Sequence, residues 1–204
     1  AGGHRIGITG TAVIKEDKVS FIKDISGLNY RLAGEVIGAA DEAVPMILKG
    51  GGIKNTLIIS PPGAGKTTML RDIVRQLSYK SYRVSVVDER SEIAALCEGR
   101  SSFDLGFSTD VLEGVDKAEG MLMVLRSMSP DVIVTDEIGK QSDIDAIERI
   151  TISGAGVIAT IHGRNIDMIK RRDDLKRMLK FFDLIITLSK RKGIGTVEEA
   201  LTEW

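Results

Sequence analysis

The sequence predicts an α/β domain with a mainly parallel sheet, preceded by a small antiparallel β segment. From residue 53 onward, short apolar runs rich in β-branched residues alternate with segments whose apolar residues recur at helical spacing. The short runs are apolar throughout, as expected for parallel strands that are covered on both faces. Residues 5–32 differ, because they consist of β-like runs separated by turn residues.

Short β-like runs dominate the start of the chain. The four runs are Arg5–Thr9, Ala12–Lys15, Val19–Ile25 and Leu28–Leu32. Gly10-Thr11 and Glu16-Asp17 supply turn residues between the first three runs. We therefore predict a small antiparallel meander over residues 1–32.

A helix is predicted next. Residues 33–49 carry apolar side chains at helical spacing, and Gly50-Gly51-Gly52 follows them. Glycine adopts the left-handed conformation common at helix ends, so we expect the helix to end there. The chain is thus divided into a β-rich segment 1–32, a linker helix within 33–52 and an α/β domain over 53–204.

Strands and helices alternate in the predicted α/β domain. The expected strands are Thr56–Ile59, Arg83–Val87, Asp131–Thr135, Gly156–Ile161 and Leu184–Leu188. The expected helices cover about 66–79, 116–128, 142–153 and 166–179. Asp116 is expected to be the N-cap of the second helix.

Composition narrows the class of protein. The 204 residues are enough for one α/β domain and a small appendage, and the net charge of -1 offers no general attraction for nucleic acid. The basic runs Lys170-Arg171-Arg172 and Lys190-Arg191-Lys192 are expected to be solvated helix ends and loops. Cys97 is the single cysteine, so no intrachain disulfide or cysteine-based zinc cluster can form. No apolar run approaches the ~20 residues of a membrane-spanning helix.

A glycine-rich loop stands between the first strand and the first helix of the predicted domain. Its sequence, Ser60-Pro-Pro-Gly-Ala-Gly-Lys-Thr-Thr68, has the Gly-Lys-Thr of the Walker A pattern, with a serine in place of the first glycine. Gly63 and Gly65 still let main-chain N–H groups curl around an anion. We expect Lys66 to reach the β- and γ-phosphates and the Thr67 hydroxyl to ligate Mg²⁺. The residues predicted to bind the nucleotide are Ser60, Pro61, Pro62, Gly63, Ala64, Gly65, Lys66, Thr67 and Thr68.

Two adjacent carboxylates follow another predicted strand. The segment Val132-Ile-Val-Thr-Asp136-Glu137 has the Walker B arrangement, in which a buried strand ends in acids. Asp136 is expected to act on Mg²⁺ through a bound water, and Glu137 to orient and polarise the attacking water. A structural ion pair is the alternative for either residue. The two motifs together predict a Mg²⁺-dependent ATPase.

A second acidic group lies at the end of the strand Arg83–Val87. We expect Asp88 and Glu89 to face the γ-phosphate region, with Glu92 on the following turn, because ligands bind at this edge of a parallel sheet. The alternative is a solvated acidic loop neutralised by Arg90.

His162 ends the strand that begins at Gly156. Thr160 and His162 are expected to point to the same side of this strand, where either could sense a γ-phosphate. A purely structural histidine is the alternative.

These motifs resemble the core of the type II and type IV secretion and pilus ATPases. The matching strings include Leu125-Arg126, Pro130–Val134, Glu137-Ile138, Gly156 and Thr160–His162. Those proteins carry Walker A, an acidic "Asp box", Walker B and a "His box" in this order. The chain is more similar still to the stage III sporulation protein AA family. That resemblance rests on Gly2–Gly7, Lys23–Ile25, Asn55–Ile59, Asp88–Ile93, Lys117–Gly120, Arg126–Asp131 and Gly193-x-Gly-Thr196.

The resemblance implies a RecA-like P-loop NTPase that uses ATP and Mg²⁺. It implies a cytoplasmic ATPase of the mother cell that lies at a membrane and energises a secretion-like channel into the forespore. Such proteins form hexameric rings in which a neighbouring subunit completes each site. An N-terminal domain is expected before the motor, with residues 1–32 as its remnant.

The resemblance leaves several roles open. The family tends to have an arginine where Ser108 stands, so Arg90, Arg100 and Arg126 are candidates to act across a subunit boundary. The Asp box often carries the catalytic glutamate in these ATPases. Glu89 and Glu92 therefore compete with Glu137 for the role of base, and His162 and Arg126 complete the predicted catalytic residues.

Two other functions share this core. A nucleic-acid-dependent ATPase of the RecA-like or helicase class would need a basic track, and the 4% aromatic content supplies few stacking platforms. A small-molecule kinase would need an arginine-rich lid, and no separate lid segment is evident in the sequence. The adenine is expected to contact the segment around Arg31–Glu35, on the side of the loop away from the γ-phosphate.

Overall fold

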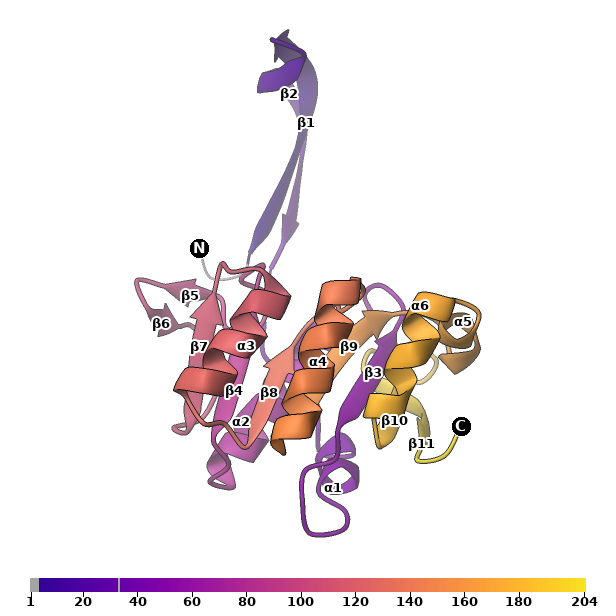
Figure 1. Ribbon diagram of the computed structural model, residues 1–204. Helices are drawn as coiled ribbons and strands as arrows, with labels where there is room; N and C mark the ends of the chain where they lie inside the picture. Colours follow the sequence, from indigo (N-terminus) through magenta and orange to yellow (C-terminus); the bar gives the residue numbers. More distant parts are fainter. Residues whose placement is uncertain (1–3, 33) are drawn as a thin grey trace.

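A computed structural model describes residues 4–32 and 34–204. Its main feature is a seven-stranded sheet in the order β11-β10-β3-β9-β8-β4-β7, with helices on both faces (Figure 1). The strands are β3 Thr56–Ser60, β4 Val84–Asp88, β7 Thr109–Glu113, β8 Val132–Thr135, β9 Gly156–His162, β10 Leu184–Ser189 and β11 Thr196–Leu201. Neighbouring strands are parallel except for the antiparallel pair β10–β11. The predicted α/β class with a mainly parallel sheet is confirmed.

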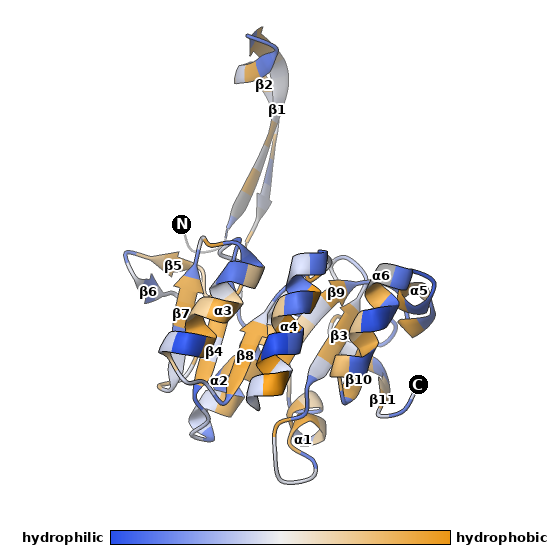
Figure 2. Cartoon of the chain, in the orientation of Figure 1, coloured by the Kyte–Doolittle hydropathy of each residue, from blue (hydrophilic) through white to orange (hydrophobic). Residues whose placement is uncertain are grey.

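Two apolar cores sandwich this sheet. Ile58 of β3 packs in a core with helix α2 (Lys66–Tyr79) and the short helix α1 (Ala43–Ile47), whereas Leu57 and Ile59 pack in a core on the opposite face. The opposite face is covered by α3 Lys117–Ser127, α4 Gln141–Ser153, α5 Ile166–Lys170, α6 Asp173–Lys176 and the 3-10 helix η1 Arg177–Phe181. Figure 2 shows apolar strands with the polar faces of α3 and α4 turned outward. Burial on both faces explains why these strands are continuous apolar runs.

The first segment is a single long hairpin, so the predicted meander is wrong. β1 (Arg5–Lys15) pairs with β2 (Lys18–Arg31), and the hairpin projects away from the domain (Figure 1). The turn at Glu16-Asp17 is as predicted, with positive φ angles of 50° and 57°. Gly10 lies instead at a shift of register between Thr9 and Thr11, where the extra residues are on β2 and the pairing resumes without ending either strand.

The linker contains much less helix than predicted. Only Ala43–Ile47 is α-helical, and turns occupy residues 37–42. Pro45 explains the late start, since proline fits only in the first turn of a helix. Gly38, with φ of 88°, also interrupts the run. Gly50 and Gly51 end the helical region in the left-handed conformation, as predicted, whereas Ala33 lies outside the described residues.

Other differences concern the periphery of the sheet. The predicted helix over 166–179 is divided: extended Arg172, at φ −104° and ψ 111°, separates α5 from α6, and α6 continues directly into the 3-10 helix η1. The edge strands β7 and β11 were missed, since their half-exposed polar residues lack the apolar signal used for prediction. A further pair, β5 (Leu96–Cys97) and β6 (Arg100–Ser101), was missed because each strand has two residues.

No helix in the described part of the chain combines the length and the apolar character needed to span a membrane.

Candidate nucleotide site

The predicted Walker A segment lies between β3 and α2. Ser60 ends β3 and is buried, with its hydroxyl donating to the Pro61 carbonyl at 3.0 Å. Gly63 and Gly65 are left-handed, with φ of 70° and 90°, and helix α2 begins at Lys66. The first turn of α2 receives no side-chain cap from its N-cap residue Gly65. Its N–H groups are therefore free to bind an anion.

The turn between β10 and β11 covers the outer side of this loop. Gly195 N donates to the Ala64 carbonyl at 3.0 Å, and a Cβ on Gly65 would lie 3.0 Å from the same nitrogen. The Lys190 ammonium lies 3.0 Å from the position of a Cβ on Gly63. Arg191, by contrast, pairs with Glu198 at 2.9 Å. The basic run 190–192 is thus a loop beside the Walker A segment, and part of its charge is already paired.

A cavity of about 570 Å³ lies in front of the Walker A loop. It is lined by Leu32, Pro61, Pro62, Gly63, Gly65, Lys66, Thr67, Thr68, Arg90, Glu92, Glu137, His162 and Ile194. The fold therefore brings Walker A residues together with Glu137 of Walker B and with His162. Arg90 and Glu92, which follow β4, line the same cavity. Of the residues predicted to be catalytic, Glu137, Glu92 and His162 reach this cavity.

Three basic side chains contact the Glu137 carboxylate in the cavity. The carboxylate contacts Lys66 Nζ at 2.7 Å, His162 Nε2 at 2.8 Å and Arg90 Nη1 at 3.2 Å. Burial raises the pKa of Glu137, but the hydrogen bond and charge of Lys66 and the charges of His162 and Arg90 lower that pKa to about 2. The carboxylate is therefore ionised at neutral pH.

The main chain at Glu137 is strained. Its φ of 35° is uncommon for a residue with a side chain. The Glu137 N–H donates to the Thr160 hydroxyl at 2.9 Å, and the Ile138 N–H donates to the Thr160 carbonyl at 2.9 Å. Thr160 thus stabilises the turn that points Glu137 at Lys66.

Asp136 has the environment expected of a residue that meets a cation. It is 1% exposed, and neither carboxylate oxygen has a hydrogen-bond partner among the described residues. Burial raises the pKa of Asp136, while Lys117 at 3.5 Å favours the ionised form. A buried carboxylate with unused oxygens fits a Mg²⁺-bound water.

Thr67 and Asp136 are the residues near the Walker A loop that could hold Mg²⁺. No group of three or more His, Cys, Asp or Glu in residues 4–32 and 34–204 could hold a metal ion. Mg²⁺ in nucleotide sites commonly uses one or two protein ligands with phosphate oxygens and waters. Thr67 lines the cavity, and the buried Asp136 directly precedes Glu137, which also lines it.

The acidic segment separates into different roles. The Asp88 carboxylate is buried and accepts hydrogen bonds from the N–H groups of Glu92, Ile93 and Ala94 at 2.8, 2.9 and 2.8 Å. The prediction that Asp88 faces the γ-phosphate is therefore wrong, because its oxygens organise the following loop. Glu89 pairs with Lys117 at 3.0 Å and does not line the cavity.

Arg126 lies away from the cavity of its own chain. Its Nε donates to the Leu122 carbonyl at 3.0 Å within α3, and the side chain is exposed. The end of α3 that lies near Asp136 is the opposite one, at Lys117. Lys117 and Arg126 are about 13 Å apart along the helix axis, at about 1.5 Å rise per residue. A role for Arg126 or Arg100 in a neighbouring subunit stays a prediction.

Lys117 is the clearest residue that the sequence reasoning missed. It is 4% exposed and contacts both Glu89 and Asp136. A signal was present, because a lysine at the first position of a helix is disfavoured by the helix dipole. That anomaly pointed to a compensating carboxylate.

A second cavity, of about 610 Å³, continues from the first past Thr68. It is lined by Gly34, Glu35, Val36, Gly38, Ala39, Asp41, Glu42, Gly65, Thr68, Met69, Ile194, Gly195 and Val197. Gly34 and Glu35 belong to the segment predicted to contact adenine.

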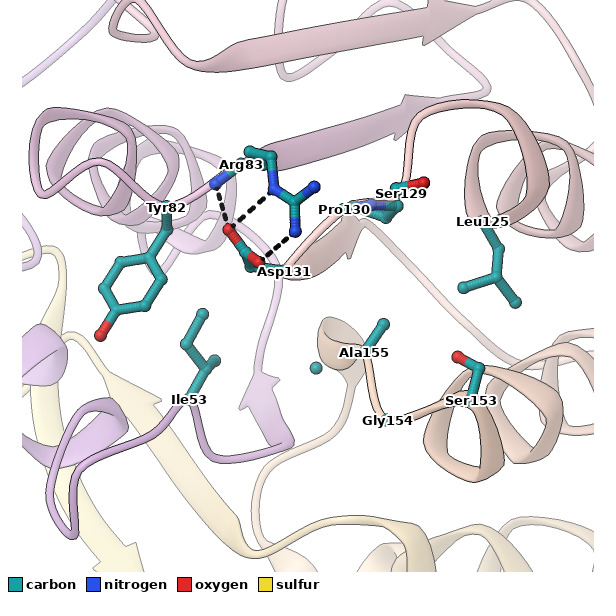
Figure 3. Close-up of a pocket in the computed structure, with 11 residues that line it drawn as sticks. Ile53, Tyr82, Arg83, Leu125, Ser129, Pro130, Asp131, Ser153, Gly154 and Ala155 are labelled. Atoms are coloured by element: carbon teal, nitrogen blue, oxygen red, sulfur yellow. Dashed lines mark hydrogen bonds and ion pairs between the residues drawn. The ribbon is translucent and has the colours of Figure 1, made fainter.

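A third cavity, of about 540 Å³, lies at the other end of the strands of the sheet; its lining residues are drawn in Figure 3. Tyr82, Leu125 and the ion pair between Arg83 and Asp131, at 2.7 Å, line it. Asp131 precedes β8, so this cavity is at the amino ends of the strands. It is separate from the Walker A loop, which follows the carboxyl end of β3.

Comparison with known proteins decides the family. A family model described as sporulation stage III, protein AA matches residues 1–203. The chain belongs to this family. Stage III sporulation protein AA of Bacillus subtilis (strain 168) is 40% identical to this chain over 205 residues, which cover 97% of this chain and 66% of that relative. The chain therefore spans slightly less than two thirds of the length of that relative.

Solved structures show the fold of the chain. The Legionella pneumophila ATPase DotB superposes with a TM-score of 0.59 at 19% identity, covering 90% of this chain and 53% of DotB. The pilus retraction motor PilT, solved with bound ADP, gives 0.58 at 18% identity, covering 91% and 58% of the two chains. The predicted RecA-like P-loop ATPase fold is confirmed.

Proposed function

We propose that the chain is a Mg²⁺-dependent ATPase that serves as the motor of a secretion-like channel between mother cell and forespore. The observation that carries the ATPase proposal is the contact between Lys66 and Glu137 in the cavity before the Walker A loop, at 2.7 Å. This contact joins a phosphate-binding lysine to a carboxylate that can act on water. A simple phosphate binder needs the lysine alone.

The nucleotide is proposed to occupy both connected cavities. Main-chain N–H groups of the Walker A loop and the α2 N-terminus bind the phosphates, because this helix end presents free donors. The base lies in the cavity formed by Glu35, Val36 and Ile194, beyond Thr68. Mg²⁺, when bound, would neutralise charge on the phosphates, with Thr67 and Asp136 as the residues that hold it.

Binding of the triphosphate exchanges the partner of Lys66. Lys66 is 8% exposed and its ammonium is paired with Glu137. A γ-phosphate competes for the same ammonium, and the exchange removes one of the two nitrogen atoms in contact with Glu137 Oε1, so that the carboxylate becomes a better proton acceptor for water. His162, at 2.8 Å from the same carboxylate, is in position to report which state Glu137 occupies. We therefore favour Glu137 over Glu89 and Glu92 as the base.

A ring of subunits is part of the proposal. Family membership and the secretion-ATPase fold support a hexamer in which Arg126 or Arg100 reaches a neighbouring site. The proposed location is the mother-cell cytoplasm at a membrane, where components of the channel would be the partners. Nucleic acid is not favoured as a partner, since the net charge is -1 and Arg191 is paired with Glu198.

Phosphate release measured against protein concentration tests both parts of the proposal. An arginine supplied in trans is worth about 10³–10⁵ in turnover. Activity per subunit should therefore rise steeply as the subunits associate, and Lys66→Ala should lose ATP binding. Constant activity per subunit, with association verified by mass, would reject shared sites. Absence of Mg²⁺-dependent hydrolysis at every concentration would reject the ATPase.

Single-stranded DNA in the same assay checks the alternative function. A DNA-dependent ATPase would be stimulated by DNA, and the stimulation would fall steeply with salt. We expect no stimulation.

A further inference from the structure

The position of Lys117 is unfavourable for a cation for two reasons. Lys117 is 4% exposed, and removal of an ammonium group from water costs solvation free energy. It is also the first residue of α3, where the helix dipole repels a cation. A lysine in this place requires close anionic partners.

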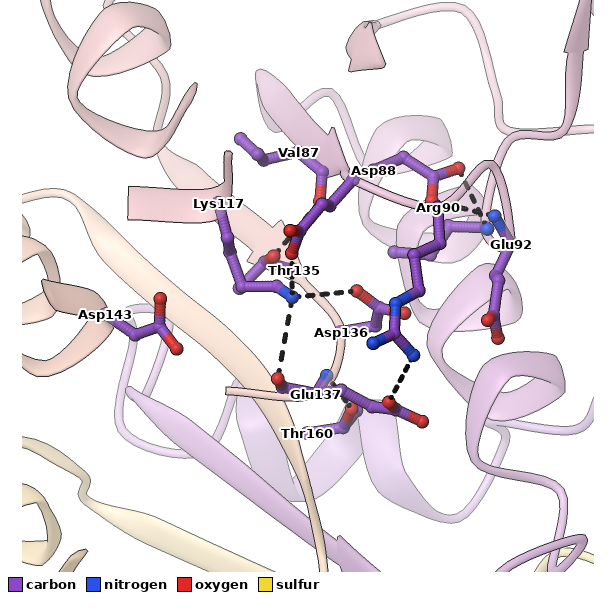
Figure 4. A network of polar contacts seen from close by, with 12 residues as sticks. Val87, Asp88, Arg90, Glu92, Lys117, Thr135, Asp136, Glu137, Asp143 and Thr160 are labelled. Atoms are coloured by element: carbon purple, nitrogen blue, oxygen red, sulfur yellow. Dashed lines mark hydrogen bonds and ion pairs between the residues drawn. The ribbon is translucent and has the colours of Figure 1, made fainter. Parts of the chain in front are cut away.

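The partners come from the ends of two strands. Lys117 Nζ lies 3.0 Å from Oε2 of Glu89, which follows β4, and 3.5 Å from Oδ1 of Asp136, which follows β8. It is also 3.5 Å from the main-chain carbonyl of Glu137 (Figure 4). One ammonium therefore connects the acidic segment to the Walker B segment.

Asp136 is held unevenly by this contact. One carboxylate oxygen faces Lys117, and the other points away from it (Figure 4). Neither oxygen accepts a hydrogen bond from the described residues, although both are buried. Lys117 thus sets the orientation of the carboxylate from one side and leaves its second oxygen unused.

Glu89 is committed to lysines on both of its oxygens. Oε2 contacts Lys117 at 3.0 Å, and Oε1 lies 3.9 Å from Lys140 Nζ. Lys140, the N-cap of α4, also contacts Asp116, the N-cap of α3, at 3.1 Å. Glu89 therefore braces the starts of both helices and does not line the nucleotide cavity.

We propose that Lys117 is a positioning residue for Asp136, the carboxylate proposed to meet a Mg²⁺-bound water. Its ammonium orients Asp136 so that the second oxygen meets the Mg²⁺-bound water, and it holds Glu89 as a brace, away from the attacking water. This inference rests on the proposed function, because Asp136 matters in this way only if the nucleotide brings Mg²⁺. It adds a residue to that function and removes Glu89 from the candidates for the base.

The test replaces Lys117 by methionine, which keeps a long apolar stem and removes the charge. Binding of a fluorescent ATP analogue is measured as Mg²⁺ is titrated, and again in EDTA. Loss of a partner that orients a metal ligand typically weakens metal affinity by about 10–100-fold. We expect Lys117→Met to raise the Mg²⁺ concentration for half-maximal effect by about that factor, with binding in EDTA unchanged. Lys140→Met is the matched control, because Lys140 contacts Glu89 and Asp116 and not Asp136, and its Mg²⁺ requirement should match wild type.

Glu89→Gln gives a second, independent result. The glutamine keeps the size of the side chain and leaves Lys117 in contact with Asp136, so we expect turnover within about threefold of wild type, because a lost general base would cost about 10²–10⁴. A loss in that larger range would overturn the bracing role. This variant keeps the bracing part of the inference falsifiable if Lys117→Met does not fold.

Wild-type protein separates the two proposals. If wild type binds ATP in a Mg²⁺-dependent way and Lys117→Met has the same Mg²⁺ requirement, the inference about Lys117 is wrong and the ATPase proposal stands. A wild type without Mg²⁺-dependent binding would refute the proposed function and this inference with it.

Discussion

Replacement of Glu137 by glutamine should have opposite effects on ATP binding and on ATP turnover. The Glu137 carboxylate pairs with Lys66 at 2.7 Å, and ATP must break that pair to use the lysine. The amide of glutamine cannot hold Lys66 as an ion pair. The variant should bind ATP more tightly and hydrolyse it more slowly.

The magnitude follows from the pKa of Glu137. Its fall from 4.5 to about 2 corresponds to roughly 3 kcal/mol, at about 1.4 kcal/mol per pKa unit. Arg90 and His162 share this interaction with Lys66, and the Glu137 side chain is 22% exposed, so solvent screens part of it. About half, ~1.4 kcal/mol, assigned to Lys66 predicts about tenfold tighter ATP binding. Loss of a general base predicts about 10²–10⁴ slower turnover.

Calorimetric titration with ATP and a phosphate-release assay on the same preparations measure the two effects. Glu119→Gln on the exposed surface of α3 is the control and should change neither quantity. Weaker ATP binding by Glu137→Gln would refute the exchange of partners at Lys66. Turnover equal to wild type would refute Glu137 as the base.

Two further predictions concern the supports of the site. Asp72 of α2 accepts hydrogen bonds from Ala40 N at 2.8 Å and Arg75 Nε at 2.8 Å; burial raises its pKa, but these partners outweigh burial and leave that pKa below 3.8. A depressed pKa stabilises the fold above the unfolded value, and the stabilisation is lost as pH falls through the folded value. Asp72→Asn should therefore cost about 1–3 kcal/mol of unfolding free energy at pH 7, and urea titrations should show the difference from wild type shrinking below about pH 4; a constant difference would contradict this. Gly65→Ala should weaken ATP binding by about tenfold or more, because φ is 90° and the new Cβ would lie 3.0 Å from Gly195 N. Gly154→Ala, with φ of 86° and nothing within 4 Å, is its control, and equal ATP affinity in both variants would show that the contact with Gly195 is unimportant.

Local patterns were enough to predict the central elements. The Walker A segment lies between β3 and α2, and Asp136 and Glu137 follow β8, because motif and flanking strand are contiguous in the chain. Fully buried strands can be recognised in the sequence as apolar runs. The edge strands β7 and β11 carry polar residues on their exposed sides, so their pairing depends on neighbours that a local window does not contain.

The roles of individual acids were decided by the tertiary structure. Asp88 and Glu89 are adjacent in sequence, yet one organises a buried loop and the other meets Lys117, which lies 28 residues further along the chain. Alternation along a strand predicts that adjacent side chains point to opposite faces of the sheet. It does not predict which residues they contact there.

The sequence determined the kind of chemistry, since a glycine loop with lysine and a strand ending in two acids are local and specific patterns. The tertiary structure decided how those groups are connected. Lys66, Arg90 and His162 converge on Glu137 from three separate segments, and Lys117 approaches Asp136 from a fourth. Ionic contacts of this kind depend on distances of a few ångströms between residues remote in sequence, and only the packing of helices against the sheet sets those distances.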